Sequence, residues 1–316
     1  MEIRIDVTRS GKTVLDILRG ELHYSSALIT FLKQRENGIL VNGEHATVRK
    51  ILYTGDVLAL HYEDTEQDQN SGIVPIDLPI EIVYCDRDIL IVNKPPYMPT
   101  HPSHDHQLDT LANAVAYHFQ HLKTPFVFRA INRLDSQTSG LVLLARNKVA
   151  AQHLSDDMVK GHIQKYYFAV LNGTLSPKDG TVDLPICREQ QSKIKRTVSE
   201  EGAPSLTRYR TLVANDMYSA VIASPITGRT HQLRVHFSHL GCQICGDTLY
   251  GYPCEYIERH ALHAFCLEFP HPSTGEIMTV TAPLPHDIEM LCESVFSFED
   301  QKILKSQRGL IDEKEP

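Results

Sequence analysis

From residue 80 onward, short apolar runs alternate with short turns, and this spacing restricts the fold more than any other feature of the chain. Runs rich in β-branched and aromatic residues predict strands. They lie at residues 80–84, 89–92, 141–145, 166–171, 207–213, 218–223 and 262–269. Helical spacing predicts helices at 111–119, 147–160 and 230–240. Because strands outnumber helices and several follow one another closely, we expect an α+β fold with a mixed, mainly antiparallel sheet and packed helices.

The first 62 residues form a unit of their own. Helical spacing at 14–18 and 26–32 is followed by strand-like runs at 38–43 and 55–60, each beginning with a glycine. The next residues are polar and acidic, which is typical of a linker. We therefore expect a small α+β domain at 1–62, an acidic linker at 63–76, a large domain at 77–298 and a charged tail at 299–316.

The charge distribution restricts the class of partner. A net charge of −8 argues against binding nucleic acid by bulk electrostatics alone. It leaves room for a local basic face, and Lys193, Lys195 and Arg196, followed by Arg208 and Arg210, form such a cluster. The competing interpretation is a solvated hairpin. No apolar run is long enough to cross a bilayer, and the N-terminus lacks a signal-peptide core, so we expect a cytoplasmic protein without a membrane partner.

The cysteines and histidines raise the question of a metal. Seven cysteines, an odd number in a long chain, indicate reduced thiols instead of a disulfide framework. The spacing of Cys242 and Cys245, with Cys254 nearby, can indicate zinc, but no second CxxC pair accompanies it. The loop 101–106 holds three histidines in a polar setting, which is more typical of a surface loop than of a metal site. We predict no metal site.

Residues 131–140 contain the most suggestive acid of the chain. They place Asp135 two residues after Arg133 and just before the apolar run 141–145. A loop acid beside an arginine, held against a buried strand, is one way to fix a reactive group in place. The same residues also describe an ordinary hydrogen-bonded turn entering a strand. The local sequence favours the turn, and a functional interpretation depends on the rest of the chain.

Four separated blocks together carry a family resemblance. They lie at residues 88–102, 133–140, 165–173 and 227–236, the last followed by Gly-Asp-x-x-Tyr-Gly at 246–251 and Leu-His-Ala at 262–264. In this order and spacing, residues 80–285 closely resemble the RluA-type pseudouridine synthases. The resemblance implies the pseudouridine synthase fold and RNA as the partner. The N-terminal unit partly resembles the small RNA-binding domain first described in a small-subunit ribosomal protein, through its Val-Asn-Gly turn at 41–43 and Gly-Asp at 55–56.

The resemblance also implies a reaction, the cofactor-free isomerisation of uridine in RNA. The N1–C1′ bond breaks, the uracil turns over, and C5 bonds to C1′. Asp135 matches the family carboxylate, which attacks C1′ or removes a ribose proton, and Arg234 matches the arginine that pairs with it. Tyr167 matches the tyrosine that stacks on the base. Arginine suits a buried acid because it stays protonated and offers a planar fork.

Other positions are expected to bind the substrate. Arg133 is the candidate for filling the space vacated by a flipped base, although a salt bridge that only positions the loop is the alternative. The remaining substrate-binding candidates are Lys165, Arg229, Leu262, Lys193, Lys195 and Arg196. Asn132 stands where the family usually has histidine, so the contact made at that position is expected to differ.

Two other functions compete with the synthase. A non-catalytic RNA-binding or ribosome-assembly protein is disfavoured by the joint presence of Asp135, Tyr167 and Arg234. A nucleoside hydrolase lacks an evident second carboxylate. A small N-terminal RNA-binding domain is more typical of relatives that act on large-subunit ribosomal RNA, so we expect ribosomal RNA rather than transfer RNA as the substrate. We expect a monomer.

Overall fold

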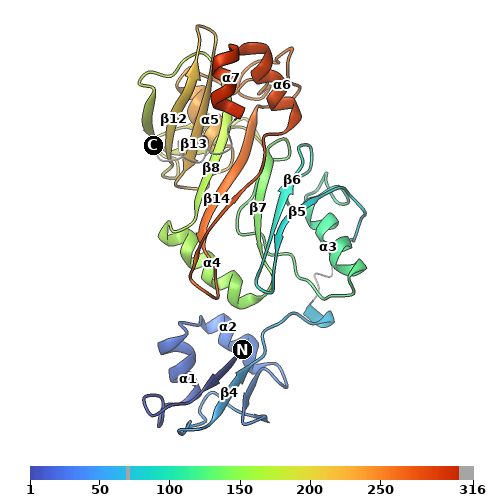
Figure 1. Cartoon of the computed structure of the whole chain (residues 1–316), viewed down its shortest axis with the longest axis vertical. Helices are drawn as coiled ribbons and strands as arrows, with labels where there is room; N and C mark the ends of the chain where they lie inside the picture. The colour runs from blue at the N-terminus through green and yellow to red at the C-terminus, as the bar shows by residue number, and fades with distance from the viewer. Residues whose placement is uncertain (69–71, 306–316) are drawn as a thin grey trace.

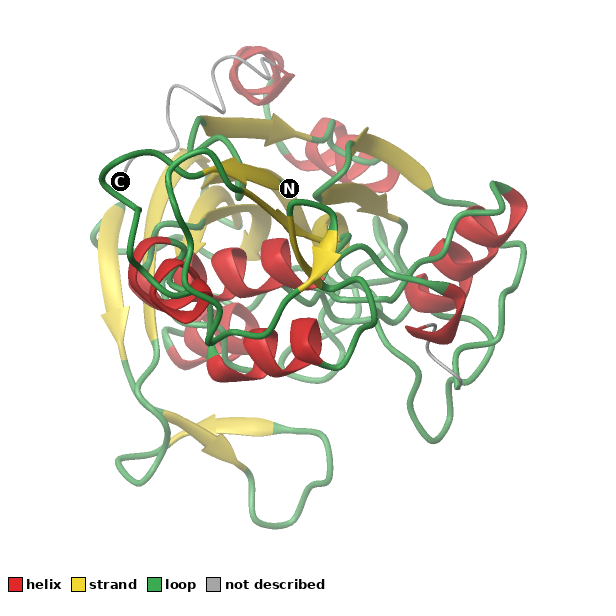
Figure 2. Cartoon of the chain, turned by 90° about the horizontal axis from the view of Figure 1, so that it is seen from below, coloured by secondary structure: helices red, strands yellow, loops and turns green. Residues whose placement is uncertain are grey.

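The computed structural model describes residues 1–68 and 72–305 of the chain. Strands and helices are intermixed along the sequence, and the view from below shows helices in the centre with strands beside and behind them (Figure 2). The expected α+β class, with a mixed and mostly antiparallel sheet, is confirmed. Within the described residues, no helix is long and apolar enough to cross a membrane.

The N-terminal unit is built on a four-stranded antiparallel sheet with the order β1-β4-β2-β3. Its elements are β1 (Glu2–Arg4), α1 (Val14–Asp16), a π-helix (Ile17–Glu21), α2 (Ser26–Lys33), β2 (Ile39–Val41), β3 (Glu44–His45) and β4 (Val57–Leu60). Thr13 and Ser25 cap the two α-helices by accepting hydrogen bonds from backbone N–H groups. Apolar side chains of the helices and strands share one core, which includes Leu18, Leu32 and Leu58.

The larger body contains a nine-stranded sheet with the order β5-β6-β7-β14-β8-β13-β12-β9, in which β15 also pairs with β14. The strands of this sheet are β5 (Glu81–Cys85), β6 (Ile89–Lys94), β7 (Ser139–Ala145), β8 (Gln164–Asn172), β9 (Asp179–Asp183), β12 (Leu206–Ala214), β13 (Tyr218–Pro225), β14 (Leu262–Pro270) and β15 (Ile277–Thr281). The pair β7–β14 is parallel and short, joining Ser139 to His263 and Gly140 to Ala264. A separate antiparallel hairpin is formed by β10 (Ile186–Arg188) and β11 (Arg196–Val198).

Side-chain alternation buries both faces of the sheet. In β6, Leu90 and Val92 enter one core, whereas Ile89 and Ile91 enter a second core on the opposite face. Helices cover both cores, and those of this body are α3 (Leu111–His121), α4 (Lys148–Lys160), α5 (Gln232–His239), α6 (His286–Val295) and α7 (Phe298–Lys305). A short 3-10 helix (Glu66–Asp68) precedes them.

Helix α4 joins the two bodies. It begins at the predicted cap Asn147 and ends at Gly161, whose φ of 75° is left-handed. Figure 1 shows this helix between the large sheet and the N-terminal unit. Val149 packs into the N-terminal core, and Gln152 accepts a hydrogen bond from the Ser25 N–H and donates one to the His23 carbonyl, each 2.8 Å long. One helix therefore contributes to the packing of both bodies.

The acidic stretch at 63–76 makes several ion pairs. Asp64 is buried against Arg129, with two Nη–Oδ distances of 2.7 Å. Asp68 pairs with Arg35, which lies just after α2. Residues 69–71 of the stretch lie outside the described residues. The polar composition of this stretch therefore does not mean that its side chains lack partners, because several carboxylates are bound to arginines of either body.

The expectation of a loose charged tail from residue 299 is wrong for its first part. Residues up to Lys305 continue helix α7, and Leu304 is buried in the main core. Ser297 accepts a hydrogen bond from the Asp300 N–H at the start of this helix. Helix α7 is difficult to predict from the sequence because its surface is charged and few apolar residues lie on its inner face. Residues 306–316 of the predicted tail lie outside the described residues.

Candidate active site

A cavity of about 610 Å³ in the larger body brings together residues from five separate segments. The loop before β7, the end of α4, strand β8, the run from the end of β13 into α5, and the start of β14 each contribute to its wall. The sequence-predicted residues that line it are Arg133, Asp135, Lys165, Tyr167, Arg229, Arg234 and Leu262. Lys193, Lys195 and Arg196 do not line it, because they belong to the β10–β11 hairpin and its turn.

The loop carrying Asp135 is fixed from both sides. Lys94, fully buried, donates to the Ser136 carbonyl at 3.1 Å and to the Met98 carbonyl at 2.7 Å. Arg259 donates to the Gln137 carbonyl at 3.0 Å. Thr138 donates its backbone N–H to the Asp135 carbonyl at 3.1 Å, which closes the predicted turn. The turn and the catalytic interpretations are therefore compatible, since the turn holds the acid in place.

Further contacts continue this anchoring into β7. Thr138 Oγ1 lies 2.8 Å from His260 Nε2, and Ser139 Oγ lies 2.9 Å from His263 Nδ1. Gly140 has a φ of 116°, and a Cβ at this position would lie 2.3 Å from the Ala264 carbonyl oxygen. The absence of a side chain is what lets β7 approach β14 so closely at the end of the loop.

Asn132 secures the other end of the loop. Its Nδ2 donates to the Leu141 carbonyl at 3.1 Å, and its Oδ1 accepts from the Leu143 N–H at 2.8 Å. Ile131 adds a backbone hydrogen bond to the Leu143 carbonyl. The amide side chain thus satisfies polar groups along the edge of β7 that β14 does not pair.

Arg234 is shared between two carboxylates. Its Nε and Nη2 donate to Asp247 at 2.6 and 2.8 Å, and its Nη1 donates to Asp135 Oδ2 at 3.2 Å. Asp247 is almost fully buried, whereas the Asp135 side chain keeps 28% of its surface exposed. Burial alone would lower the pKa of Arg234, but the carboxylate of Asp247, helped by that of Asp135, raises it. The guanidinium is therefore held by Asp247 and presented to Asp135.

Tyr167 and Lys165 lie on one face of β8 and both line the cavity. Burial, reinforced by the charge of Asp135, raises the pKa of Tyr167 well above its usual value, so the phenol is neutral near pH 7. Burial lowers the pKa of Lys165. In the part of the chain that the structure describes, neither side chain makes a hydrogen bond. Both polar ends are available to a molecule in the cavity.

The two arginines at the rim differ in their contacts. Across residues 1–68 and 72–305, Arg133 makes no hydrogen bond or ion pair, and it is exposed. Among those residues, Arg133 therefore does not form the salt bridge that the alternative interpretation requires. Arg229 donates from Nε to the Pro204 carbonyl at 3.1 Å, which ties it to the loop before β12. Arg133 is thus the freer cation of the two.

Three residues beside the acid were missed as individual candidates, although their blocks were noticed. His231 Nε2 lies 3.7 Å from Asp135 Oδ2, Tyr250 contacts His231, and Asp247 holds Arg234. The available signal was spacing, because His231 and Arg234 are three residues apart at the start of a helix and so share a face. Lys94 and His260 gave no local signal, since their roles depend on contacts far away in the sequence.

The cysteine pair whose spacing can indicate zinc lies in an apolar environment. Cys242 and Cys245 are buried in the main hydrophobic core. In residues 1–68 and 72–305, no group of three or more His, Cys, Asp or Glu side chains is arranged to hold a metal ion.

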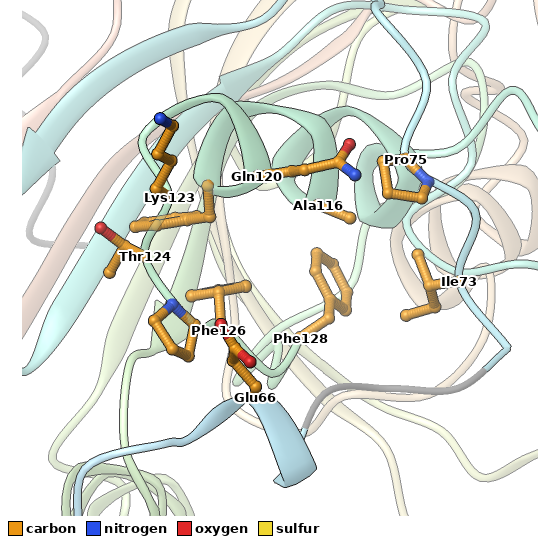
Figure 3. Close-up of a pocket in the computed structure, with 11 residues that line it drawn as sticks. Glu66, Ile73, Pro75, Ala116, Gln120, Lys123, Thr124, Phe126 and Phe128 are labelled. Atoms are coloured by element: carbon orange, nitrogen blue, oxygen red, sulfur yellow. The ribbon is translucent and has the colours of Figure 1, made fainter.

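A second cavity, of about 460 Å³, lies beside α3 and differs in chemistry (Figure 3). Its lining is mainly apolar, with Phe119, Phe126 and Phe128, and only Glu66 and Lys123 carry charge among the residues that line it. No acid–arginine pair lies in its wall. The larger cavity is therefore the candidate active site.

Comparison with known proteins agrees with this geometry. A profile described as RNA pseudouridylate synthase matches residues 88–239. The chain is 39% identical over 272 residues to the uncharacterized RNA pseudouridine synthase YjbO of Bacillus subtilis strain 168, across 86% of this chain and 95% of that protein. It is 33% identical to the ribosomal large subunit pseudouridine synthase D of Pasteurella multocida strain Pm70, across 85% of this chain and 86% of that protein.

A solved structure shares the fold as well. Human RNA pseudouridylate synthase domain containing 1 superposes with a TM-score of 0.53 at 33% identity, covering 65% of this chain and 83% of that one. The profile spans Asp135, Tyr167 and Arg234, so the matched region contains the acid–arginine pair and the residues that line the cavity, except Leu262. The chain therefore belongs to the RNA pseudouridylate synthase family and is an RNA pseudouridine synthase.

Proposed function

We propose that this enzyme converts specific uridines of large-subunit ribosomal RNA to pseudouridine, with Asp135 as its catalytic carboxylate. The observation that carries the assignment is the setting of this acid at the cavity wall. Its Oδ2 accepts a hydrogen bond from Arg234, whereas its Oδ1 accepts none within the described residues. One oxygen is thus held by the protein and the other is left for the ribose.

The chemistry requires a carboxylate at the ribose and conserves the atoms of the nucleoside. Asp135 Oδ1 acts on the ribose by attack at C1′ or by removal of a ribose proton, and both routes need the ionised acid. The electrons of the N1–C1′ bond leave with the uracil, which turns and bonds to C1′ through C5. This step breaks the bond between Asp135 Oδ1 and C1′ in the first route, and Asp135 returns the ribose proton in the second. The proton on C5 is then lost and N1 gains one, so substrate and product are isomers.

The other cavity residues suit a flipped nucleotide. A base in structured RNA has to leave its stack before a protein encloses it. Tyr167 supplies a flat, neutral ring for stacking on the uracil, and Leu262 forms an apolar wall. Lys165 and Arg229 offset phosphate charge, and the exposed Arg133 occupies the space that the base leaves.

The RNA target rests on weaker but separate support. The Pasteurella multocida relative is named a ribosomal large subunit pseudouridine synthase. We infer that the N-terminal unit, which has its own sheet and core, contacts RNA beyond the target uridine. Of the basic hairpin residues, Arg196 is linked to the cavity, because its N–H donates to Tyr250 Oη, which lies 2.9 Å from Nδ1 of the cavity residue His231. We infer a monomer that acts in the cytoplasm, where ribosomal RNA is made.

The test compares Asp135→Asn with the exposed control Asp216→Asn on unmodified bacterial large-subunit ribosomal RNA and on transfer RNA. Chemical mapping measures pseudouridine, and filter binding measures the RNA dissociation constant. We expect Asp135→Asn to lower the rate by at least about a thousandfold, since a reacting group is removed. Its RNA affinity stays within about twofold of wild type, because the amide keeps the shape of the acid. The control matches wild type in both measurements.

Each other outcome has a distinct meaning. Pseudouridine formation by Asp135→Asn at the wild-type rate contradicts the role of Asp135. Modification of transfer RNA alone contradicts the proposed target. Release of free uracil by the wild-type enzyme supports a hydrolase, and binding without modification of either RNA supports a non-catalytic role.

A further inference from the structure

A chain of polar contacts connects the basic hairpin to the catalytic acid. The Arg196 N–H, at the start of β11, donates to Tyr250 Oη at 2.8 Å. Tyr250 Oη lies 2.9 Å from His231 Nδ1, and His231 Nε2 lies 3.7 Å from Asp135 Oδ2. The four residues come from four separate segments of the chain. The mechanism proposed above uses neither His231 nor Tyr250.

The directions of these contacts follow from the number of hydrogens available. Tyr250 Oη already accepts the Arg196 N–H, and its own single hydrogen is free to point to the nearest acceptor, His231 Nδ1. Burial lowers the pKa of His231, so its imidazole is neutral near pH 7 and carries one hydrogen. With Nδ1 accepting from the tyrosine, that hydrogen resides on Nε2, the nitrogen that faces Asp135.

The surrounding structure holds this pair of rings in place. His231 adopts a left-handed backbone with a φ of 59° just before α5, a conformation that a non-glycine residue keeps only when its neighbours impose it. Its ring meets the Tyr250 ring edge-on, with centroids 5.6 Å apart. The Arg234 guanidinium lies 5.0 Å from the centre of the Tyr250 ring. The two side chains beside the acid, His231 and Arg234, are thus packed against one tyrosine.

The other end of the contact chain belongs to the hairpin. The β10–β11 pair is a two-stranded sheet separate from the nine-stranded one, and backbone hydrogen bonds between residues 184–186 and 199–205 fix its base. Lys193 and Lys195, predicted to bind RNA, lie in its turn. Arg196 contacts Tyr250 through its backbone, and its side chain folds back onto the Ile194 carbonyl. The position of β11 therefore determines where Tyr250 Oη is bound.

We propose that Tyr250 and His231 are positioning residues that orient the Asp135 carboxylate according to the position of the β10–β11 hairpin. RNA that engages the hairpin then brings His231 Nε2–H into hydrogen-bond contact with Asp135 Oδ2, leaving Oδ1 aimed at the ribose. This inference rests on the proposed function. It adds that RNA contact at the hairpin and the arrangement of the acid are one coupled event.

The test uses the full-length enzyme and two substitutions that change few atoms. Tyr250→Phe removes the hydroxyl but keeps the ring packed on His231 and Arg234. His231→Gln keeps a donor near the position of Nε2 but removes the Nδ1 acceptor that receives the hydroxyl hydrogen of Tyr250. The matched control is Tyr252→Phe, because Tyr252 is 64% exposed and close in sequence. The substrate is in vitro transcribed bacterial large-subunit ribosomal RNA tritiated at uridine C5, and tritium release under single turnover measures the reaction.

We expect Tyr250→Phe and His231→Gln each to lower the single-turnover rate at saturating RNA by about tenfold, the effect of one lost positioning hydrogen bond. The RNA dissociation constant stays within about twofold, because no proposed RNA contact is removed. The double variant falls no more than about twofold below the slower single variant, because both changes interrupt one connection. Multiplying effects, or a change in RNA affinity with an unchanged rate, overturn the proposal.

A second measurement does not depend on any variant remaining active. The ¹⁵N spectrum of the wild-type enzyme reports which imidazole nitrogen carries the hydrogen, and the signals of His231 are those missing in His231→Gln. A neutral ring protonated at Nε2 is expected, and protonation at Nδ1 overturns the inference. If wild-type enzyme releases no tritium from ribosomal RNA, the proposed target fails, whereas the spectrum still decides the hydrogen-bond order.

Discussion

Replacing Asn132 with alanine removes two anchors of the loop that carries Asp135 while leaving in place every cavity residue that we propose to contact substrate. The side chain is buried and bonds both the Leu141 carbonyl and the Leu143 N–H. Alanine leaves these two backbone groups without a partner. A buried polar group that loses its partner costs about 1–3 kcal/mol. Two such groups together cost about 2–6 kcal/mol. We expect the free energy of unfolding to fall by about 3 kcal/mol, toward the lower end of this range, because the site can relax.

For a body of this size, that loss corresponds to a decrease of about 6–12 °C in the melting temperature. Differential scanning calorimetry measures it, and tritium release at a temperature well below the transition measures the turnover. The rate should fall by about tenfold, because a loosened loop holds Asp135 less accurately. RNA affinity should remain close to wild type.

The matched control is Asn93→Ala. Asn93 makes one hydrogen bond on the surface, to Glu81 at 2.7 Å, and its loss is expected to cost less than about 1 kcal/mol. A loss of about 1 kcal/mol shifts the melting temperature by at least about 2 °C. If the melting temperatures of Asn132→Ala and the control differ by less than about 2 °C, the predicted loss of stability is refuted. An intact turnover in a clearly destabilised variant refutes only the link between loop anchoring and rate.

Two further predictions concern the neighbouring junction of β7 and β14. Gly140→Ala places a Cβ 2.3 Å from the Ala264 carbonyl oxygen, so we expect the free energy of unfolding in urea to fall by at least about 2 kcal/mol, with a matching loss of activity. The control Gly161→Ala meets nothing within 4 Å and should lower the free energy of unfolding by only about 1 kcal/mol, through backbone strain. Equal losses of stability in the two variants contradict the argument. Burial lowers the pKa of His260 and of His263 to about 3, so the unfolded chain binds more protons below pH 6.5 and stability falls as the pH drops from there. At pH 5 each histidine should cost about 2 kcal/mol relative to pH 7, and an unchanged pH slope in His263→Asn speaks against this origin.

Local signals in the sequence predicted much of the sheet and the helix ends. The Asn147 cap and the Gly161 stop of α4 depend on chemistry within a few residues, and both are seen in the structure. Strands β6, β7 and β8 are buried on both sides and so appear in the sequence as continuous apolar runs. Short edge strands such as β1 and β15 were not predicted, because a few residues with exposed positions carry little pattern.

The site was predictable only as far as its motifs were recognisable. Asp135, Tyr167 and Arg234 were named from a resemblance, and the structure places all three around one cavity. Asp247 accepts two hydrogen bonds from the Arg234 guanidinium. This contact depends on the path of the chain after α5, which no local sequence pattern specifies. The role of Lys94 likewise depends on a loop more than forty residues later in the chain.

The anchors of the Asp135 loop have a consequence for the timing of activity. Gln137 and Thr138 are held by Arg259 and His260, each 122 residues later in the sequence. While the chain is being synthesised, the motif that carries the acid leaves the ribosome long before the residues that fix it. A nascent chain therefore has the reactive group without the geometry, and it gains activity only when β14 joins the sheet. The enzyme therefore acts on RNA only after its synthesis is complete, and measurable turnover indicates that the chain has folded.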